Sequence, residues 1–153
     1  MSDSVREHLS ADIKSAMRAR DTAQLTVLRM LSAAIKQREV DERVTLGEAD
    51  VIALVDKLIK QRKDAAQQFA DGGRDDLADA ERAEIEILGR YLPQALSADE
   101  VDAAITAAIA SIASTGASGL ADMGKVMAVL KPQLAGRADM GEASKQVRAQ
   151  LSR

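Results

Sequence analysis

The chain has 153 residues, 46% of them apolar, and carries a formal net charge of −3. Alanine occurs 29 times and only Phe69 and Tyr91 are aromatic, whereas β-strands favour β-branched and aromatic residues. The composition therefore argues against a β-sandwich or barrel and predicts an all-α fold. The lack of cysteine and the single histidine, His8, exclude disulfides, thiolate catalysis and Cys/His metal sites. We expect neither a resident metal nor a cofactor.

The net charge of −3 argues against indiscriminate nucleic-acid binding and leaves room for a local basic patch. No apolar run approaches the roughly 18 residues of a membrane span. Residues 1–7 lack the basic start and apolar run of a signal peptide. These features predict a cytoplasmic protein that does not contact membranes.

Helix signals recur along the first 92 residues and predict four helices. In a capping box, a Ser or Thr and a Glu three residues later each accept a backbone N–H. The pattern occurs at residues 4–7 and again at 45–48, and Asp21 is a further N-cap candidate. Gly72-Gly73 predicts the end of the third helix, because glycine adopts left-handed backbone without penalty. Pro93 predicts the end of the fourth.

Apolar residues at helical spacing predict the buried face of each of these helices. In the first helix, Val5, Leu9, Ile13 and Met17 fall every four residues on one stripe. The inward positions expected in the second helix are Leu25, Leu28, Leu31 and Ile35. In the third they are Val51, Leu54, Val55, Leu58, Ile59, Ala65, Ala66 and Phe69, and in the fourth Leu77, Ala80, Ile85, Leu88 and Tyr91. Residues 1–92, with 15 basic and 18 acidic side chains, are predicted to form one helical bundle.

Residues 93–153 differ from residues 1–92 in charge composition, with six basic and six acidic side chains. Three helical segments are predicted there around a small-residue loop at 114–119: an Ala-rich helix opened by a capping box at 97–100, a short helix over 123–130 that Lys131-Pro132 stops, and a last helix over 141–151. We interpret them as a small second domain of three helices.

Basic residues give the functional lead, because positive side chains near turns and helix ends can contact phosphates. The predicted nucleic-acid contacts in the second domain are Lys125, Lys131, Arg137, Lys145 and Arg148. A secondary anion site is predicted from Lys60, Lys63 and Arg74. The alternative is that these cations serve only solubility and helix-end charge.

The carboxylates give no catalytic signal. Glu81 and Glu84 share a helix face three residues apart, and we interpret them as part of a solvated, ion-paired surface. Neither Asp71-Gly72-Gly73-Arg74 nor Met123-Gly124-Lys125 matches a nucleotide-binding loop. No catalytic residue is therefore predicted.

Several segments resemble one family when they are taken together and in order. They are Gln61-Arg62-Lys63-Asp64, Gly72-Gly73-Arg74, Tyr91-Leu92-Pro93, Met123-Gly124-Lys125-Val126-Met127 and Gly136-Arg137-Ala138-Asp139. They resemble the YqeY-like proteins of bacteria, and the resemblance covers almost the whole chain. It implies an N-terminal helical bundle and a small C-terminal helical domain. The latter is similar to the tail of GatB, a subunit of the amidotransferase that amidates Glu-tRNA(Gln) or Asp-tRNA(Asn).

The resemblance implies a tRNA-associated accessory module, with tRNA and an amidotransferase or aminoacyl-tRNA synthetase as expected partners. It points to Lys125 and Arg137 as phosphate contacts. It also carries the label of a carbon–nitrogen ligase with glutamine as amido donor. This chain contains none of GatB's catalytic domain, so we expect no intrinsic catalysis. The alternative function is a protein-interaction or structural helical module without RNA binding.

Overall fold

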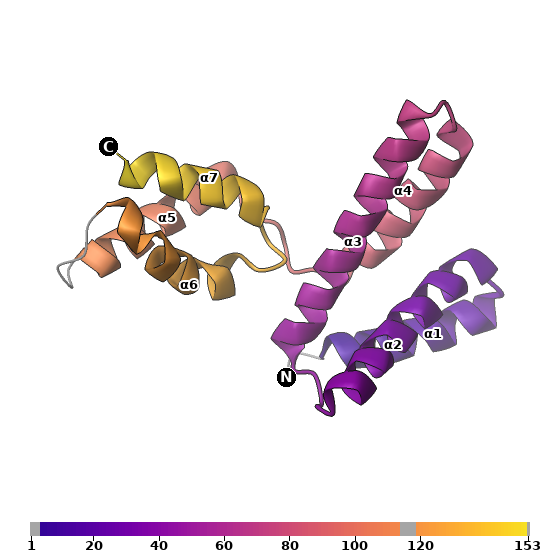
Figure 1. Ribbon diagram of the computed structural model, residues 1–153. Coiled ribbons are helices and arrows are strands. Elements are labelled where there is room, and N and C mark those ends of the chain that lie inside the picture. Colours follow the sequence, from indigo (N-terminus) through magenta and orange to yellow (C-terminus); the bar gives the residue numbers. More distant parts are fainter. Residues whose placement is uncertain (1–3, 114–118, 153) are drawn as a thin grey trace. The chain divides into compact units, whose positions relative to one another are not determined.

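The computed structural model describes residues 4–113 and 119–152. Every regular element in those ranges is a helix, which confirms the predicted all-α fold (Figure 1). The chain divides into two compact units, Met1–Leu92 and Pro93–Arg153, and each is described by itself. Over the described ranges, no helix combines the length and apolar character needed to cross a bilayer.

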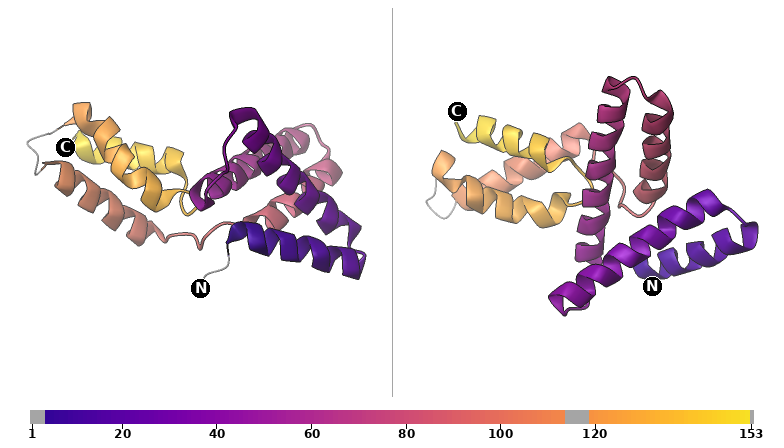
Figure 2. Two further views of the ribbon diagram at one scale, coloured as in Figure 1. Left: turned by 90° about the horizontal axis from the view of Figure 1, so that it is seen from below. Right: turned by 45° about the vertical axis from the view of Figure 1, so that its right-hand side comes forward.

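The first unit is built from two helical hairpins. The first hairpin pairs α1 (Val5–Ala19) with α2 (Thr22–Glu42), and the second pairs α3 (Glu48–Asp71) with α4 (Asp75–Gly89). Both hairpins can be followed in Figure 2, where the long helix α3 runs beside α4. The hairpins meet through contacts of α2 with α4 and of α3 with both α1 and α2.

The helix starts of the first unit follow the predicted caps in two cases out of three. The Ser4 hydroxyl accepts the Glu7 N–H, and the Glu7 carboxylate accepts the Ser4 N–H. The carboxylate of Asp21 accepts the Gln24 N–H at 3.1 Å and so caps α2. Both caps use residues three apart in sequence, which is why the local pattern predicted them.

The capping box predicted at residues 45–48 is wrong. The N-cap of α3 is Gly47, whose N–H donates to Oδ2 of Asp50 at 3.2 Å. The carboxylate of Glu48 instead accepts the N–H of Val5, at 3.1 Å, in the first turn of α1. A contact between residues 43 positions apart therefore takes the side chain that the local pattern assigned to the cap.

In the second hairpin, the end of α3 agrees with the prediction and the end of α4 differs from it. As predicted, α3 ends before Gly72-Gly73, and Gly73 has a φ of +74°, in the left-handed region. The fourth helix ends at Gly89 and not at Pro93. Tyr91 lies in the turn beyond it, where its buried side chain donates a 2.5 Å hydrogen bond to Oδ2 of Asp12 on α1.

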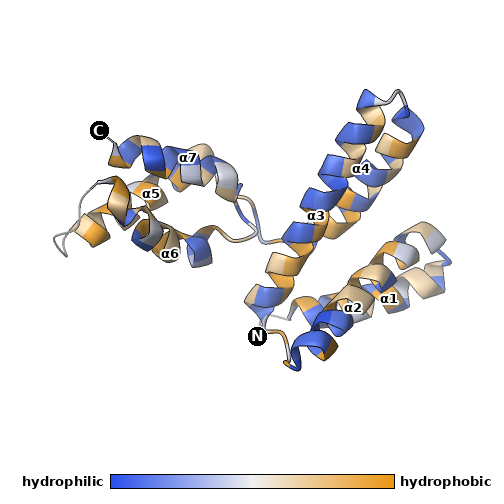
Figure 3. Cartoon of the chain, viewed as in Figure 1, coloured by the Kyte–Doolittle hydropathy of each residue, from blue (hydrophilic) through white to orange (hydrophobic). Residues whose placement is uncertain are grey.

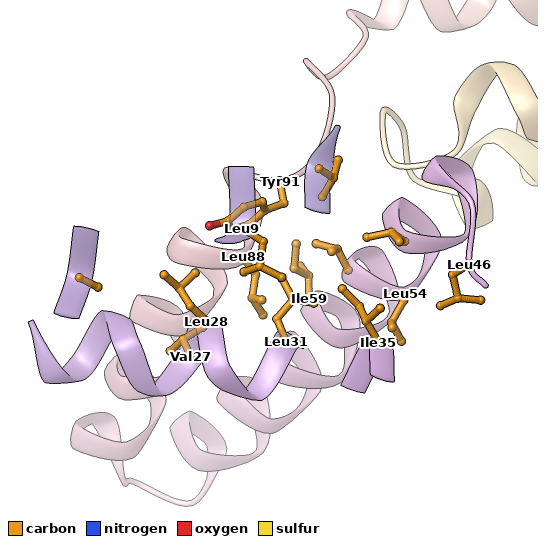
Figure 4. Close-up of a cluster of buried hydrophobic side chains, with 14 residues drawn as sticks. Leu9, Val27, Leu28, Leu31, Ile35, Leu46, Leu54, Ile59, Leu88 and Tyr91 are labelled. Atoms are coloured by element: carbon orange, nitrogen blue, oxygen red, sulfur yellow. The ribbon is translucent and has the colours of Figure 1, made fainter. Parts of the chain in front are cut away.

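The core of the first unit joins both hairpins (Figure 4). Its fully buried side chains are Leu28, Leu31, Val51, Val55 and Leu88. Met17, expected on the inward stripe of α1, is 52% exposed, and Ala16 is buried instead. A four-residue step rotates the side chain by about 40° around the helix, so the stripe drifts off the buried face after three steps. Ala80 is likewise exposed, and its neighbour Ala78 is buried.

The second hairpin extends beyond this shared core. Between Ile59 and Leu88 its buried residues are Ala66 and Ala78, and neither belongs to the shared cluster. The two halves of α3 therefore have different surroundings: the first packs in the common core, and the second packs on α4.

The second unit is a bundle of three α-helices with its own core. Its elements are α5 (Ala98–Ala113), the 3₁₀ turn η1 (Leu120–Asp122), α6 (Met123–Leu134) and α7 (Met140–Leu151). The Ser97 side chain and Glu100 carboxylate form the predicted capping box at the start of α5. Apolar and hydrophilic positions intersperse along these helices (Figure 3), and the fully buried residues are Ile105, Val126, Leu130, Leu134 and Val147. The predicted loop at 114–119 lies outside the described residues except for Gly119.

The short helix α6 continues through Pro132 to Leu134, so the predicted stop at Leu130 is wrong. Proline removes one helical hydrogen bond and crowds the preceding turn. Leu134 is fully buried four residues after Leu130, on the same helix face. Burying a leucine side chain is worth about 1.5–3 kcal/mol, which offsets a proline in the last turn.

Candidate nucleic-acid interface

The five cations predicted to contact nucleic acid lie on two helices and one connection of the second unit. Lys125 and Lys131 lie on α6, Lys145 and Arg148 lie on α7, and Arg137 lies in the turn between these helices. The first four are exposed, and Arg137 is half-buried. Four long, charged side chains are therefore available to a partner in solution.

The α7 cations share one exposed face. Lys145 and Arg148 are three residues apart and lie away from Ala143 and Val147, which are buried against the other helices. Nζ of Lys145 lies 3.3 Å from Oε1 of Glu142, and both side chains are largely exposed. Such a pair contributes little in water, so a phosphate can compete for this lysine.

The α6 cations face different sides of their helix. Six residues separate Lys125 from Lys131, which on an ideal helix is a rotation of about 240°. Lys131 lies in the last turn, where the unpaired carbonyl groups at the helix end stabilise a positive charge. Among the described residues, neither lysine forms an ion pair. The α6 lysines therefore do not make a single patch with each other.

The Arg137 side chain is oriented by the backbone of its own unit. Its Nε donates to the carbonyl oxygen of Gln94 at 3.0 Å, and its carbonyl oxygen accepts the Leu96 N–H at 2.8 Å. The preceding Gly136 has a φ of +72°, which places the turn in the left-handed region that glycine tolerates. Arg137 thus fixes the first residues of the second unit and keeps its Nη edge for other contacts.

The secondary anion site predicted in the first unit is not brought together. Lys60 pairs with Asp56 at 3.2 Å, and Arg74 pairs with Asp76 at 3.1 Å. The hydrogen bond from Arg74 lowers the pKa of the Asp76 carboxyl. Lys63 precedes the end of α3 by eight residues, a rise of about 12 Å, so it lies well away from Arg74.

Arg62 has a structural role that the sequence analysis did not predict. Nε of Arg62 donates to Oε2 of Glu84 at 2.8 Å, and Nη1 donates to the Leu58 carbonyl oxygen at 3.3 Å. Nη2 lies 3.5 Å from the sulfur of Met30 on α2. The signal was present: Arg62 follows Ile59 by three residues on the buried stripe of α3. The Arg62 side chain therefore joins α2, α3 and α4.

Over the described ranges, no group of three or more His, Cys, Asp or Glu side chains is placed so that it could hold a metal ion. The charged groups instead tie helices together. Arg6 on α1 pairs with Glu39 on α2 at 2.5 Å, and Glu39 also accepts the Leu46 N–H at 2.8 Å. The hydrogen bond from Arg6, followed by that from Leu46, lowers the pKa of the Glu39 carboxyl.

Comparison with known families adds the decisive observation. The model of the Yqey-like protein family matches residues 6–151, nearly the full length of the chain and both of its units. The chain belongs to the YqeY-like family. This confirms the resemblance drawn from its segments.

Among curated YqeY-like relatives, this chain is similar to the fungal "Altered inheritance of mitochondria protein 41, mitochondrial". It is 39% identical over 102 residues to the protein of Lachancea thermotolerans, which covers 65% of this chain and 54% of that relative. It is 38% identical over 112 residues to the Eremothecium gossypii protein, covering 71% and 61%. In Saccharomyces cerevisiae strain YJM789 the identity is 35% over 95 residues, covering 61% and 51%. The matches span between half and about three fifths of the relatives' lengths.

These names overturn the predicted cytoplasmic location, because each of them places the relative in mitochondria. The physical reason for the error is general. Targeting segments are read by import machinery and are removed from many mature proteins, so the composition of a folded domain does not report its compartment.

Proposed function

We propose that this YqeY-like chain is an accessory module that binds tRNA through its second unit. The observation that carries the proposal is the exposure of Lys125, Lys131, Lys145 and Arg148 on one small helical unit. That unit has equal numbers of basic and acidic residues, whereas residues 1–92 have an acidic excess. The second unit is therefore the less repulsive of the two toward phosphate.

Phosphate contacts made by these cations would position the RNA without reading its sequence. Arg137 can add a further contact, because its anchored guanidinium loses little freedom when its Nη edge meets a phosphate. A few contacts give modest affinity alone. A partner enzyme that also holds the tRNA would raise it through effective concentration. The resemblance of the second unit to the GatB tail favours an amidotransferase or an aminoacyl-tRNA synthetase as that partner.

The test is a titration of fluorescently labelled tRNA with the full chain at several salt concentrations. Each lost phosphate contact lowers the slope of log affinity against log salt by about one unit. The variant Lys145→Ala with Arg148→Ala removes both cations of the α7 face. We expect it to bind more weakly and to lose about two units of slope.

The matched control is Lys14→Ala with Lys57→Ala, which removes two exposed lysines from the first unit and changes the net charge equally. It should retain the wild-type slope. Equal slopes in the α7 variant and the wild type would contradict the proposal. So would a wild-type chain that fails to bind tRNA at low salt. Either result would favour a protein-interaction module, for which affinity capture would then identify the partner.

A further inference from the structure

Asp122 stands out among the charged residues of the described ranges because it alone is buried, with 7% of its surface exposed. It ends η1 and precedes α6. Its Oδ2 atom has no hydrogen-bond partner. No ion pair joins it to a cation of the described residues. This oxygen is therefore left without the hydrogen bond that buried polar atoms usually have.

Asp122 is the N-cap residue of α6, and its side chain makes no capping hydrogen bond with that helix. A buried oxygen without a partner among the described residues favours a donor from outside the chain, since leaving it unpaired destabilises the fold.

A cavity of about 160 Å³ opens beside this carboxylate within the second unit. Cavities of ~150 Å³ accept molecules the size of benzene. Most of the described wall is aliphatic, with side chains from α5, α6 and α7, and Gln150 is the other polar residue among the described lining residues. The aliphatic lining residues are Ile109, Ile112, Ala113, Val126 and Leu151, and Gly119 also lines the cavity. Gln150 already donates from Nε2 to Asp102 at 3.2 Å.

We propose that this cavity binds a primary ammonium group on a short alkyl stem. An ammonium supplies up to three N–H donors and a positive charge to Asp122, and the stem packs against the aliphatic wall. A phosphate or carboxylate ligand would be repelled by Asp122. A hard metal ion would need several more oxygen ligands than the described wall provides. The ligand is either a free alkylamine or the lysine side chain of a partner protein.

The experiment follows the backbone amide resonances of the full, isotopically labelled chain during titration with n-butylammonium chloride. Saturable shifts are expected for Asp122, Val126 and Leu151. 1-Butanol has the same stem and no charge. It should bind at least about tenfold more weakly, because it cannot replace the paired charge.

The variant Asp122→Asn keeps the side-chain volume and removes the charge. Its affinity for n-butylammonium should be at least about tenfold lower than that of the wild type, the same factor as expected for 1-butanol on the wild type. It should unfold no more easily than the wild type, because the unpaired charge disappears. The control is Asp99→Asn, which removes an exposed carboxylate from the first turn of α5 and should leave binding unchanged.

Equal binding of n-butylammonium and 1-butanol would overturn the proposal. So would unchanged binding by Asp122→Asn, or an absence of shifts in the folded wild type. Competition by Nα-acetyl-lysine methylamide distinguishes the two sources of the ammonium. Displacement of n-butylammonium supports a lysine side chain, whereas binding of n-butylammonium without displacement supports a free alkylamine.

Discussion

Arg62 on α3 and Glu84 on α4 form an ion pair in which Nε and Oε2 are 2.8 Å apart. The Arg62 side chain is 17% exposed and the Glu84 side chain 37% exposed, so this pair is better shielded than the surface pairs of either helix. It lies beyond the end of the apolar cluster that the two hairpins share. A charged contact thus lies where the shared apolar cluster ends and the pairing of α3 with α4 alone begins.

Replacing Glu84 by glutamine should lower the free energy of unfolding of the first unit by about 1–3 kcal/mol. The change leaves the Arg62 charge without an anion while keeping the size of the side chain. Urea unfolding can be followed through Tyr91, the only tyrosine of the chain. The control Glu86→Gln changes an exposed residue of α4 and should stay within about 0.5 kcal/mol of the wild type. Equal stabilities of the two variants would refute the role of the ion pair.

Replacing Arg137 by alanine should release the segment that begins the second unit. The variant loses the side-chain bond to the Gln94 carbonyl, worth about 1 kcal/mol, and weakens the hold on Leu96. A protease that cleaves at leucine should therefore cut at Leu96 faster than in the wild type. Arg148→Ala, on the exposed face of α7, serves as the control. An unchanged rate of cleavage in Arg137→Ala would contradict the role of this arginine as an anchor.

The first unit should become less stable as the pH rises above about 10, the ordinary value for tyrosine. Burial, and then the hydrogen bond to Asp12 and its charge, raise the pKa of the Tyr91 hydroxyl. The unfolded chain therefore loses this proton at a lower pH than the folded one, so alkali favours unfolding. Tyrosinate absorbance of the folded chain should appear only well above pH 10. Tyr91→Phe, followed by circular dichroism, should show a smaller loss of stability over the same range.

At low pH, the Glu39 carboxyl should make the first unit less stable as the pH falls. Its lowered pKa means that the folded state releases the proton more readily than the unfolded chain. The contribution is present above the ordinary glutamate value of about 4.3 and is lost as the pH falls through the lowered value. Glu39→Gln should flatten the acid limb of the stability curve. Glu42→Gln, an exposed neighbour on α2, should reproduce the wild-type limb, and identical curves for all three proteins would contradict this assignment.

Helix type and most helix starts could be predicted because their causes are local. Ser4 and Ser97 each meet a glutamate three residues later, within a single turn. The same pattern at Thr45 failed because Glu48 pairs with Val5, and sequence spacing contains no information about that contact. Pro132 failed for a related reason, since the burial of Leu134 depends on the packing of α5 and α7.

The candidate interface could be predicted as a set of residue types and not as a surface. The spacing of Lys145 and Arg148 places them on one helix face, as expected for residues three apart. The partner of Arg137 could not be found, because Gln94 is 43 residues away. The cavity at Asp122 was equally hidden, since three helices contribute its wall. Contacts between distant residues, and not propensities, determine these features.

The division of α3 between two environments has a consequence for amide hydrogen exchange. The amide of Val55 lies in a turn that the shared core covers, so it should exchange only when the first unit unfolds as a whole. Beyond Ile59 the helix depends on α4, and the pair can open from the Gly73 end while the core remains folded. Exchange rates should therefore rise along the second half of this one continuous helix, with a step near Arg62, where Glu84 gives the last tie to the interior.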